Sequence, residues 1–391
     1  MKIVQFGLHY SPNVGDGVIS ETLGYTLQSV RPDVEFETVD ISGRSGFGAV
    51  TVRNRSLALA VLGALPQALR GRLVEARLNR MLDGVEEDWR RVLAGAELVI
   101  LGGGQIFSDA DLNFCTKIGR LAALVRETET PVVVHAAGVS RNWSDRGTTL
   151  FGRLFDADLR GVGLRDSLSI ENWGAQTGGR GPAPVCTRDP GLLAAECYGP
   201  VDQALGDIAL GITAPQVLHY HSDAQVAGAG QGGLSFFAEL AVTLVERGYS
   251  VRLFCNGAQE DRAAMAKVTA DPRVAPLCAE GQVVVAPAPN TPADLACIIR
   301  SADAVIAHRM HACIVAYSYA IPVVGLGWDR KLESFLLSVQ DPDGFIGSAD
   351  ATAWAVADRV EARLASGVDR AVHGEVLEET RAGVAGLLSL L

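Results

Sequence analysis

The sequence predicts an α/β protein with two parallel sheets, and three observations support this. Short apolar runs suited to buried strands alternate with segments whose apolar residues recur at helical spacing. This alternation occurs in two series, which meet near residue 200 at the stretch YGPVDQALGD. At 391 residues the chain is also long for a single core. Two Rossmann-like domains facing a cleft, formed by residues 1–200 and 201–391, are the simplest interpretation.

The first series predicts strands separated by helical patterns. It begins with KIVQFGLHY at 2–10, which leads through the glycine-containing stretch 11–17 into the helical pattern VISETLGYTLQSV at 18–30. Mostly apolar runs then predict four further strands. These runs are VEFETVD (34–40), ELVILGGG (97–104), PVVVHAAGV (131–139) and LRGVGLRD (159–166).

The second series repeats this pattern toward the C-terminus. Strands are expected at IALGIT (208–213), SVRLFCNG (250–257), QVVVAPAP (282–289), AVIAHR (304–309) and PVVGLGW (322–328). Helices are expected between them at 234–248, 260–270 and 291–302. Because strands and helices alternate, both sheets should be parallel and covered by helices on both faces.

The composition excludes several classes of protein. Charged residues make up 20% of the chain and hydrophobic ones 48%, which is typical of a globular protein and not of a disordered one. The formal net charge of −11 argues against general nucleic-acid binding, which needs a basic face. The opening MKIVQFGLHY is too short for a signal-peptide core, and no apolar run approaches the roughly 20 residues that span a bilayer. We therefore expect a cytoplasmic protein.

Neither the cysteines nor the histidines form a metal-binding pattern. His308 and His311 are three residues apart, but the chain has no H-E-x-x-H motif and no carboxylate set near them, so no metal is expected. The seven cysteines are scattered without a C-x-x-C pair, which predicts buried, reduced thiols. They are Cys115, Cys186, Cys197, Cys255, Cys278, Cys297 and Cys313.

The segment 41–80 departs from the acidic character of the rest of the chain. It contains seven arginines and a single acid, Glu75, and mixes them with leucine and alanine in SLALAVLGALPQALRGRL. A basic amphipathic segment of this kind can lie on an anionic membrane surface, which predicts a peripheral contact with the inner membrane face. The alternative, a core helix with a solvated arginine face, also fits the pattern. The arginines are Arg44, Arg53, Arg55, Arg70, Arg72, Arg77 and Arg80.

Two glycine-containing stretches follow predicted strands in the first half. Gly15 would allow close approach of the backbone, and Asp16 could cap a helix or accept a hydrogen bond from a hydroxyl. Gly103 and Gly104 complete a run of three glycines that something must approach closely, whether a ligand or another segment. The run lacks the G-x-G-x-x-G spacing and the lysine of a P-loop, so it does not predict dinucleotide binding.

Positive side chains lie where strands should meet helices. His308, Arg309, Met310 and His311 follow the strand at 304–307 and precede a helical pattern. In open α/β sheets this turn lies at the edge where ligands bind, and the first N–H groups of the helix can meet an anion. The arginine therefore indicates an anionic ligand, and His311 could hydrogen-bond a phosphate or transfer a proton.

Two further basic residues are expected at strand ends. Arg165 follows the strand before residue 165, where it could pair with Asp166 or bind the ligand. Lys331 follows the strand that ends near residue 328 and can reach the carboxyl edge of the second sheet as a point charge.

Five motifs together resemble the polysaccharide pyruvyl transferase family. They occur in the family's order, and segment 41–80 has no counterpart among them. The motifs are NVGDGVISETL (13–23), LGGGQIFSD (101–109), LRDSLSIENWG (164–174), TRDPGLL (187–193) and HRMHACIVAYSYAIPVVGLGWDRKLESF (308–335).

The resemblance implies a fold, a reaction and a set of roles. It implies a fold like that of the GT-B glycosyltransferases, and transfer of a pyruvyl group from phosphoenolpyruvate to two hydroxyls of a sugar, with release of phosphate and without a cofactor. The sugar would belong to a polysaccharide or its lipid-linked precursor. Residues 309–311 match the family's Arg-x-His donor-binding motif, and Arg165 matches its second donor-binding arginine. His311 is then the candidate acid/base, and Asp16 the candidate for orienting or deprotonating the acceptor.

Two other functions stay open, because fold alone does not determine function. The first is a GT-B-type glycosyltransferase that uses a nucleotide sugar, for which FCNGAQED (254–261) would have to form part of a nucleotide pocket. The second is a saccharide-binding protein without catalytic activity. Charged residues that converge on one edge favour an enzyme over this second alternative.

Overall fold

The chain forms two compact units in the computed structural model, which describes residues 1–48, 67–201, 205–216, 218, 233–328 and 330–391. Unit 1 comprises Met1–Ser11, Leu23–Pro190 and Ala382–Leu391, and unit 2 comprises Pro12–Thr22 and Gly191–Arg381. This division differs from chain order, because residues 12–22 pack with the second half of the chain and residues 382–391 with the first. Helices α1 (Gly15–Val30) and α16 (Arg370–Gly386) therefore have residues in both units.

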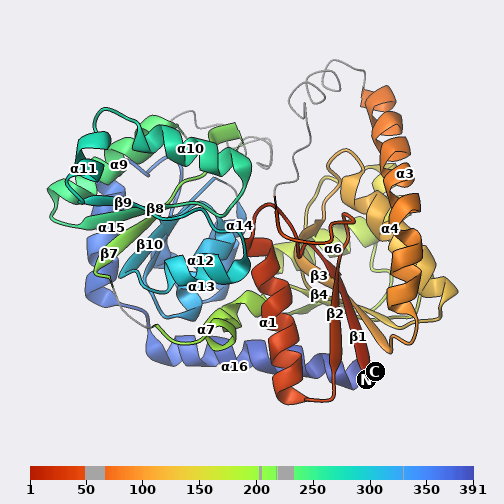
Figure 1. Ribbon diagram of the computed structural model, residues 1–391. Coiled ribbons are helices and arrows are strands. Elements are labelled where there is room, and N and C mark those ends of the chain that lie inside the picture. Colours follow the sequence, from red (N-terminus) through yellow and green to blue (C-terminus); the bar gives the residue numbers. More distant parts are fainter. Residues whose placement is uncertain (49–66, 202–204, 217, 219–232, 329) are drawn as a thin grey trace. The chain divides into compact units, whose positions relative to one another are not determined.

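Unit 1 is built on a sheet of six parallel strands in the order β2-β1-β3-β4-β5-β6 (Figure 1). The longest strand, β3, is almost entirely buried in the middle of the sheet. The strands are β1 (Lys2–Gly7), β2 (Glu35–Asp40), β3 (Leu98–Phe107), β4 (Val132–Val139), β5 (Leu159–Leu164) and β6 (Val185–Cys186).

Helices cover both faces of this sheet. Because successive strand residues point to opposite faces, Ile3 belongs to one hydrophobic cluster while Val4 and Phe6 belong to another. In the second cluster Phe107 packs edge-to-face on Trp173, with ring centroids 5.1 Å apart. The remaining helices of unit 1 are α3 (Gln67–Leu93), α4 (Asn113–Glu127), α5 (Asp145–Phe151), η1 (Gly152–Asp156) and α6 (Ser167–Thr177).

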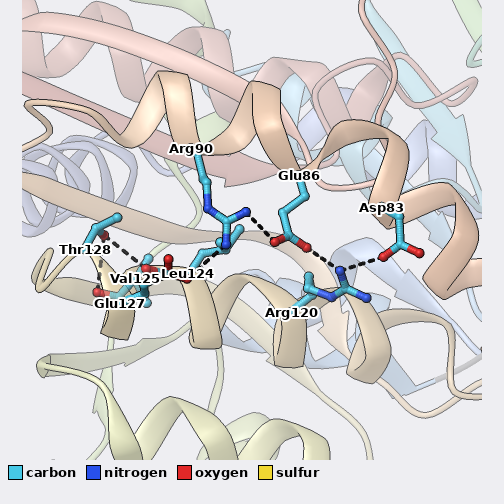
Figure 2. Close-up of polar contacts among 8 residues, drawn as sticks. All are labelled: Asp83, Glu86, Arg90, Arg120, Leu124, Val125, Glu127 and Thr128. Carbon is cyan, nitrogen blue, oxygen red and sulfur yellow. Dashed lines mark hydrogen bonds and ion pairs between the residues drawn. The ribbon is translucent and has the colours of Figure 1, made fainter.

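A row of ion pairs joins α3 to α4 (Figure 2). Glu86 of α3 lies between two arginines, with Arg90 Nη1 2.5 Å from its Oε1 and Arg120 of α4 at its Oε2. Arg120 also pairs with Asp83 at 2.9 Å. The hydrogen bonds from these arginines, that of Arg120 first, hold the pKa of the Glu86 carboxyl below its usual value. The C-terminal half of α3 is thus attached to unit 1 by charge as well as by packing.

Unit 2 contains a second sheet of six parallel strands, in the order β12-β11-β10-β7-β8-β9 (Figure 1). The strands are β7 (Asp207–Gly211), β8 (Ser250–Phe254), β9 (Val283–Val285), β10 (Ala304–Ala307), β11 (Val323–Leu326) and β12 (Phe345–Ile346). Its helices are α7 (Ala194–Tyr198), α9 (Leu234–Glu246), α10 (Gln259–Thr269), α11 (Ala275–Ala279), α12 (Pro292–Ile299), α13 (Met310–Ser318), α14 (Arg330–Ser338) and α15 (Ala353–Ser366). Single 3-10 turns are η2 (Pro190–Leu193), η3 (Pro342–Gly344) and η4 (Leu387–Leu390), the last in unit 1.

The predicted fold class is confirmed, since both sheets consist of parallel strands that alternate with helices along the chain.

All seven cysteines are free thiols, and Cys115, Cys255 and Cys313 are buried as expected. The expectation of burial is wrong for Cys186, which lies in the short edge strand β6, and for Cys297, which lies on the solvent side of α12. Across the described residues, none of the helices is long and apolar enough to cross a membrane.

Candidate active site

The turn after β10 places four of the predicted residues at the start of α13. His308 follows the strand, Arg309 is the N-cap residue in an extended conformation (φ −78°, ψ 112°), and Met310 and His311 open the helix. Such a turn lies at the carboxyl end of a parallel sheet, the edge at which α/β proteins bind ligands. Met310 and Arg309 are partly exposed there, while His311 is 7% exposed.

His311 pairs with Asp16, which lies in the first turn of α1. The Nδ1 atom of the imidazole is 3.2 Å from Oδ1 of the carboxylate. The opposite ring nitrogen, Nε2, is buried and has no hydrogen-bond partner among the described residues. A carboxylate at Nδ1 favours the tautomer with its hydrogen on that atom and fixes the orientation of the ring. The structure thus brings together two predicted residues that lie far apart in the sequence.

Gly15 makes this contact possible. A Cβ atom added at Gly15 would lie 2.6 Å from Cβ of His311, closer than real Cβ atoms come to other heavy atoms. It would also lie 3.2 Å from Nδ2 of Asn256, which is 1% exposed and follows β8. The carbonyl of Asn256 accepts a hydrogen bond from the Val14 N–H at 2.9 Å. The loop after β8 therefore holds the start of α1 against His311.

A buried carboxylate fixes the side chain of Arg309. Both Nε and Nη2 of Arg309 donate to Oδ2 of Asp261, at 3.1 and 2.6 Å. Asp261 is fully buried in the first turn of α10, and its Oδ1 accepts a hydrogen bond from the Ala214 N–H at 2.8 Å. This pairing leaves Nη1 of Arg309 without a protein acceptor in the part of the chain that is described. One edge of the guanidinium is therefore free to bind an anion.

His308 has a different environment from the one expected of a ligand-binding residue. Its ring is buried and packs edge-on against Phe237, with centroids 5.5 Å apart. Burial, and then the charge of Arg309, lower the pKa of His308 to about 3, so the ring is neutral near pH 7. The backbone carbonyl of His308 accepts a 3.0 Å hydrogen bond from Nε1 of Trp328. The centroid of the Trp328 ring lies 5.7 Å from Nζ of Lys331.

In unit 1, Arg165 lies directly after β5 and is nearly buried. Its Nη2 donates to Oε1 of Gln105 at 2.7 Å, and its Nε donates to Oδ2 of Asp166 at 3.3 Å. Asp166 also caps α6 by accepting from the Ser169 N–H at 2.7 Å. The guanidinium rests on Gly138, where an added Cβ would lie 2.8 Å from Cζ. Arg165 is thus held rigidly by its own unit, whatever ligand it meets.

The three glycines after Leu101 have structural reasons to be glycine. Gly103 and Gly104 have φ angles of 83° and 77°, in the left-handed region that favours glycine. A Cβ at Gly102 would lie 1.9 Å from the carbonyl oxygen of His135 on the neighbouring strand β4. Close packing of β3 on β4 accounts for Gly102, and local backbone shape accounts for the other two.

Three candidate site residues were not predicted from the sequence, namely Asn256, Asp261 and Gln105. The first two lie in FCNGAQED, directly after β8, and Gln105 follows the glycine run of β3. The signal that could have found them is their position at the carboxyl end of a parallel strand. In the described part of the chain, no group of three or more His, Cys, Asp or Glu residues is arranged to hold a metal ion.

The family model described as polysaccharide pyruvyl transferase matches residues 13–330, which is most of the chain. That range contains all the residues of both units that are described above as site candidates, apart from Lys331. No curated protein sequence is significantly similar to this one.

Solved structures share the fold at low sequence identity. UDP-GlcNAc 2-epimerase from Methanocaldococcus jannaschii aligns with a TM-score of 0.57 and 9% identity, over 100% of this chain and 99% of that one. UDP-N-acetylglucosamine 2-epimerase from Rickettsia bellii aligns with a TM-score of 0.52 and 11% identity, over 100% and 95%. A UDP-forming α,α-trehalose-phosphate synthase from Burkholderia xenovorans gives 0.50 and 11%, over 100% and 98%. These likenesses show a GT-B-like fold of two Rossmann-like domains and carry no argument about substrate.

Proposed function

The chain belongs to the polysaccharide pyruvyl transferase family, and we propose that it moves a pyruvyl group from phosphoenolpyruvate to two hydroxyls of one sugar. The products are a cyclic ketal and phosphate. Membership makes the protein a transferase with a sugar or polysaccharide acceptor; the donor and the ketal chemistry are the proposal. The observation that supports it most is the pairing of His311 with Asp16, which leaves a buried, partnerless Nε2 at the carboxyl edge of a parallel sheet.

His311 is the proposed acid. In the doubly protonated form of the ring, Nε2–H gives its proton to the methylene carbon of phosphoenolpyruvate. Positive charge then develops at the neighbouring carbon, which a sugar hydroxyl attacks. The phosphate leaves with its bonding electrons, and the second hydroxyl attacks the same carbon to close the ketal. One hydroxyl proton returns to Nε2 and the other leaves with phosphate, so the ring is restored for the next turnover.

The proposed role of Asp16 follows from its contact with His311. From the sequence we expect it to act on the acceptor, but its Oδ1 lies against His311. We assign it the positioning of the imidazole, by the same logic that governs carboxylate–histidine pairs in hydrolases. In this role Asp16 holds the Nδ1–H throughout the cycle, so that Nε2 is the nitrogen that loses and regains a proton.

Arg309 is the proposed ligand for the phosphate or carboxylate of the donor. The free edge of a guanidinium that Asp261 already holds in place can form charge-assisted hydrogen bonds at little entropic cost. Arg165, at the carboxyl edge of unit 1, remains the second proposed donor-binding arginine, and Lys331 a proposed point charge. His308 is assigned a supporting role under the turn because its ring is buried.

Calorimetric titration with phosphoenolpyruvate tests this proposal. Arg309→Lys keeps the charge but loses the planar fork, so affinity should fall by about tenfold or more. Arg273→Lys is the matched control, because Arg273 of unit 2 is an exposed arginine that pairs with Asp271 and Ser235. Equal affinity in the wild type and Arg309→Lys would rule out the assigned donor contact. If a nucleoside diphosphate raises the melting temperature where phosphoenolpyruvate does not, a nucleotide-sugar glycosyltransferase becomes the better assignment.

A further inference from the structure

A second charged cluster lies in unit 1, at the carboxyl ends of β1 and β2. Its centre is Asp40, the last residue of β2, whose side chain is buried. The carboxylate accepts hydrogen bonds from the N–H groups of Tyr10 and Ser42, at 2.9 and 2.8 Å. Arg44 Nη1 lies 3.3 Å from Oδ2 and 3.4 Å from Oδ1. With Lys117, these residues form what we call the Asp40 cluster: Asp40, Ser42, Arg44 and Lys117.

Lys117 is the member whose charge is least compensated. It lies on α4 and is 4% exposed, and its Nζ donates to Oγ of Ser42 at 2.9 Å. Its other contact is the ring of Phe114, 5.4 Å from Nζ. No carboxylate of the described residues lies within ion-pair distance of it. An ammonium group has three donors and is costly to bury without an anionic partner.

The net positive charge of the cluster favours binding of an anion. Arg44 and Lys117 give two positive charges against the single negative charge of Asp40. Burial, and then the charge of Arg44, lower the pKa of Lys117 to about 8, although Asp40 acts in the opposite direction. An anion beside the ammonium would stabilise its charge and so oppose both of these causes of the lowered pKa.

Three aromatic rings lie beside this charge. His9, Tyr10 and Phe47 pack against one another with centroid distances of 4.4, 5.2 and 5.0 Å, and all three are partly exposed. We call them the aromatic trio. Tyr10 joins it to the cluster through the hydrogen bond from its N–H to Asp40. His9 adds a buried Nδ1 that has no hydrogen-bond partner among the described residues. Aromatic faces next to a few convergent polar groups are typical of small-molecule sites.

We propose that the Asp40 cluster and the aromatic trio bind the acceptor as a sugar attached to a phosphate or diphosphate, with Lys117 and Arg44 on the phosphate and the rings on the sugar. Calling the ligand an acceptor rests on the proposed function; the anion site itself does not. The shared chemistry, a glycosyl phosphate, occurs both in lipid-linked and in nucleotide-linked sugars.

The position of the cluster in the sheet separates it from the proposed donor arginine of the same unit. Arg165 follows β5, and β3 and β4 lie between β5 and β1. Three strand spacings of about 4.8 Å place β5 roughly 14 Å from β1. The two sites therefore extend from well-separated strands of the sheet, and we assign Lys117 and Arg165 to different anionic groups.

Calorimetric titration with inorganic pyrophosphate tests the site directly. The wild-type chain should bind it, and Lys117→Met, which keeps the length of the side chain without its charge, should weaken binding by about tenfold or more. Arg126→Gln is the matched control, since Arg126 is exposed on the same helix, and it should bind like the wild type. Lys117→Met should melt no lower than the wild type, because it removes a poorly paired buried charge. Equal pyrophosphate affinity in Lys117→Met and the wild type would overturn the proposal.

Competition separates the sources of the phosphate. Uridine diphosphate glucose and a polyprenyl diphosphate sugar in detergent micelles are each titrated against bound pyrophosphate, and the one that competes at lower concentration identifies the carrier. If pyrophosphate binds but neither sugar competes, the site is not an acceptor site. Phosphoenolpyruvate affinity is measured on the same Lys117→Met protein and should equal that of the wild type. A wild type that binds pyrophosphate but not phosphoenolpyruvate would defeat the proposed function and leave the anion site standing.

Discussion

His311 Nδ1 lies 3.2 Å from Asp16 Oδ1, and the contact joins the first turn of α13 to the first turn of α1 within unit 2. The segment that follows β8 supports both sides of it, since Asn256 in the loop holds Val14 and Asp261 in the first turn of α10 holds Arg309. Three segments of unit 2 therefore fix one imidazole with a single nitrogen left for chemistry.

Asp16→Asn should reduce turnover while leaving the Michaelis constant for phosphoenolpyruvate within a few-fold of the wild type. The amide can offer a hydrogen to Nδ1 and favour the wrong tautomer, so the expected loss in kcat is about 10²-fold or more. Steady-state measurement of phosphate release gives both constants. A change confined to the Michaelis constant for the sugar would instead show that Asp16 contacts the acceptor.

Gly15→Ala should lower both stability and turnover. The new Cβ would lie 2.6 Å from Cβ of His311, so helix α1 or the imidazole must move, at a cost of about 1–3 kcal/mol. Urea denaturation measures the loss. Gly174→Ala is the control, because a Cβ there meets nothing within 4 Å on helix α6, where alanine is favoured. If Gly15→Ala is as stable and active as Gly174→Ala, the close approach of α1 to α13 is not required.

His308 should make the protein less stable in acid. Its pKa is about 3 in the folded state, below the unfolded value of 6.5, so its stabilising contribution is complete above pH 6.5 and is lost as the pH falls toward 3. Between pH 7 and pH 5 the wild type should lose about 2 kcal/mol of unfolding free energy that His308→Leu keeps. Urea titrations at the two pH values measure this. Identical losses in both proteins would mean that the buried ring is not the source.

The arginines of helix α3 should support binding to anionic membranes. Arg77 and Arg80 are exposed, and Glu75, the one acid of segment 41–80, pairs with Arg146 at 2.5 Å and does not neutralise them. The side chains of Arg70 and Arg72 lie outside the described part of the chain. Each basic residue near an anionic surface can contribute on the order of 1 kcal/mol.

Cosedimentation with anionic liposomes measures this at low and high salt. Wild-type protein should bind in low salt, and a variant with Arg70, Arg72, Arg77 and Arg80 changed to Gln should not. Wild-type protein that stays in the supernatant at low salt would show that these arginines only face water.

The sequence predicts the sheets better than the site, for physical reasons. Buried parallel strands need continuous apolar runs, so AVIA coincides with β10 (Ala304–Ala307). Strand ends also locate Arg309 and His311. The contacts with Asn256 and Asp261 depend on the order of strands in the sheet, in which β8 lies two places from β10, and a single sequence does not reveal that order.

The unit to which residues 12–22 belong and the burial of His308 also depend on three-dimensional packing that a single sequence does not reveal. Residues 12–22 include the first half of α1, which continues into unit 1, so chain order assigns them to the first domain. Packing against Asn256 and Gly257 nevertheless places them in unit 2. Of segment 41–80, residues 49–66 lie outside the described part of the chain. The burial of His308 is invisible in the sequence, because the same turn exposes Arg309 and encloses its neighbour.

Phosphate release from phosphoenolpyruvate, measured over a panel of acceptor sugars that includes lipid-linked ones, tests the central claim most directly. We expect acceptor-dependent release by the wild type. We also expect kcat to fall by about 10²-fold or more in His311→Ala, while phosphoenolpyruvate affinity stays within a few-fold of the wild type. Turnover by His311→Ala at the wild-type rate, or no release by the wild type with any acceptor of the panel, would contradict it.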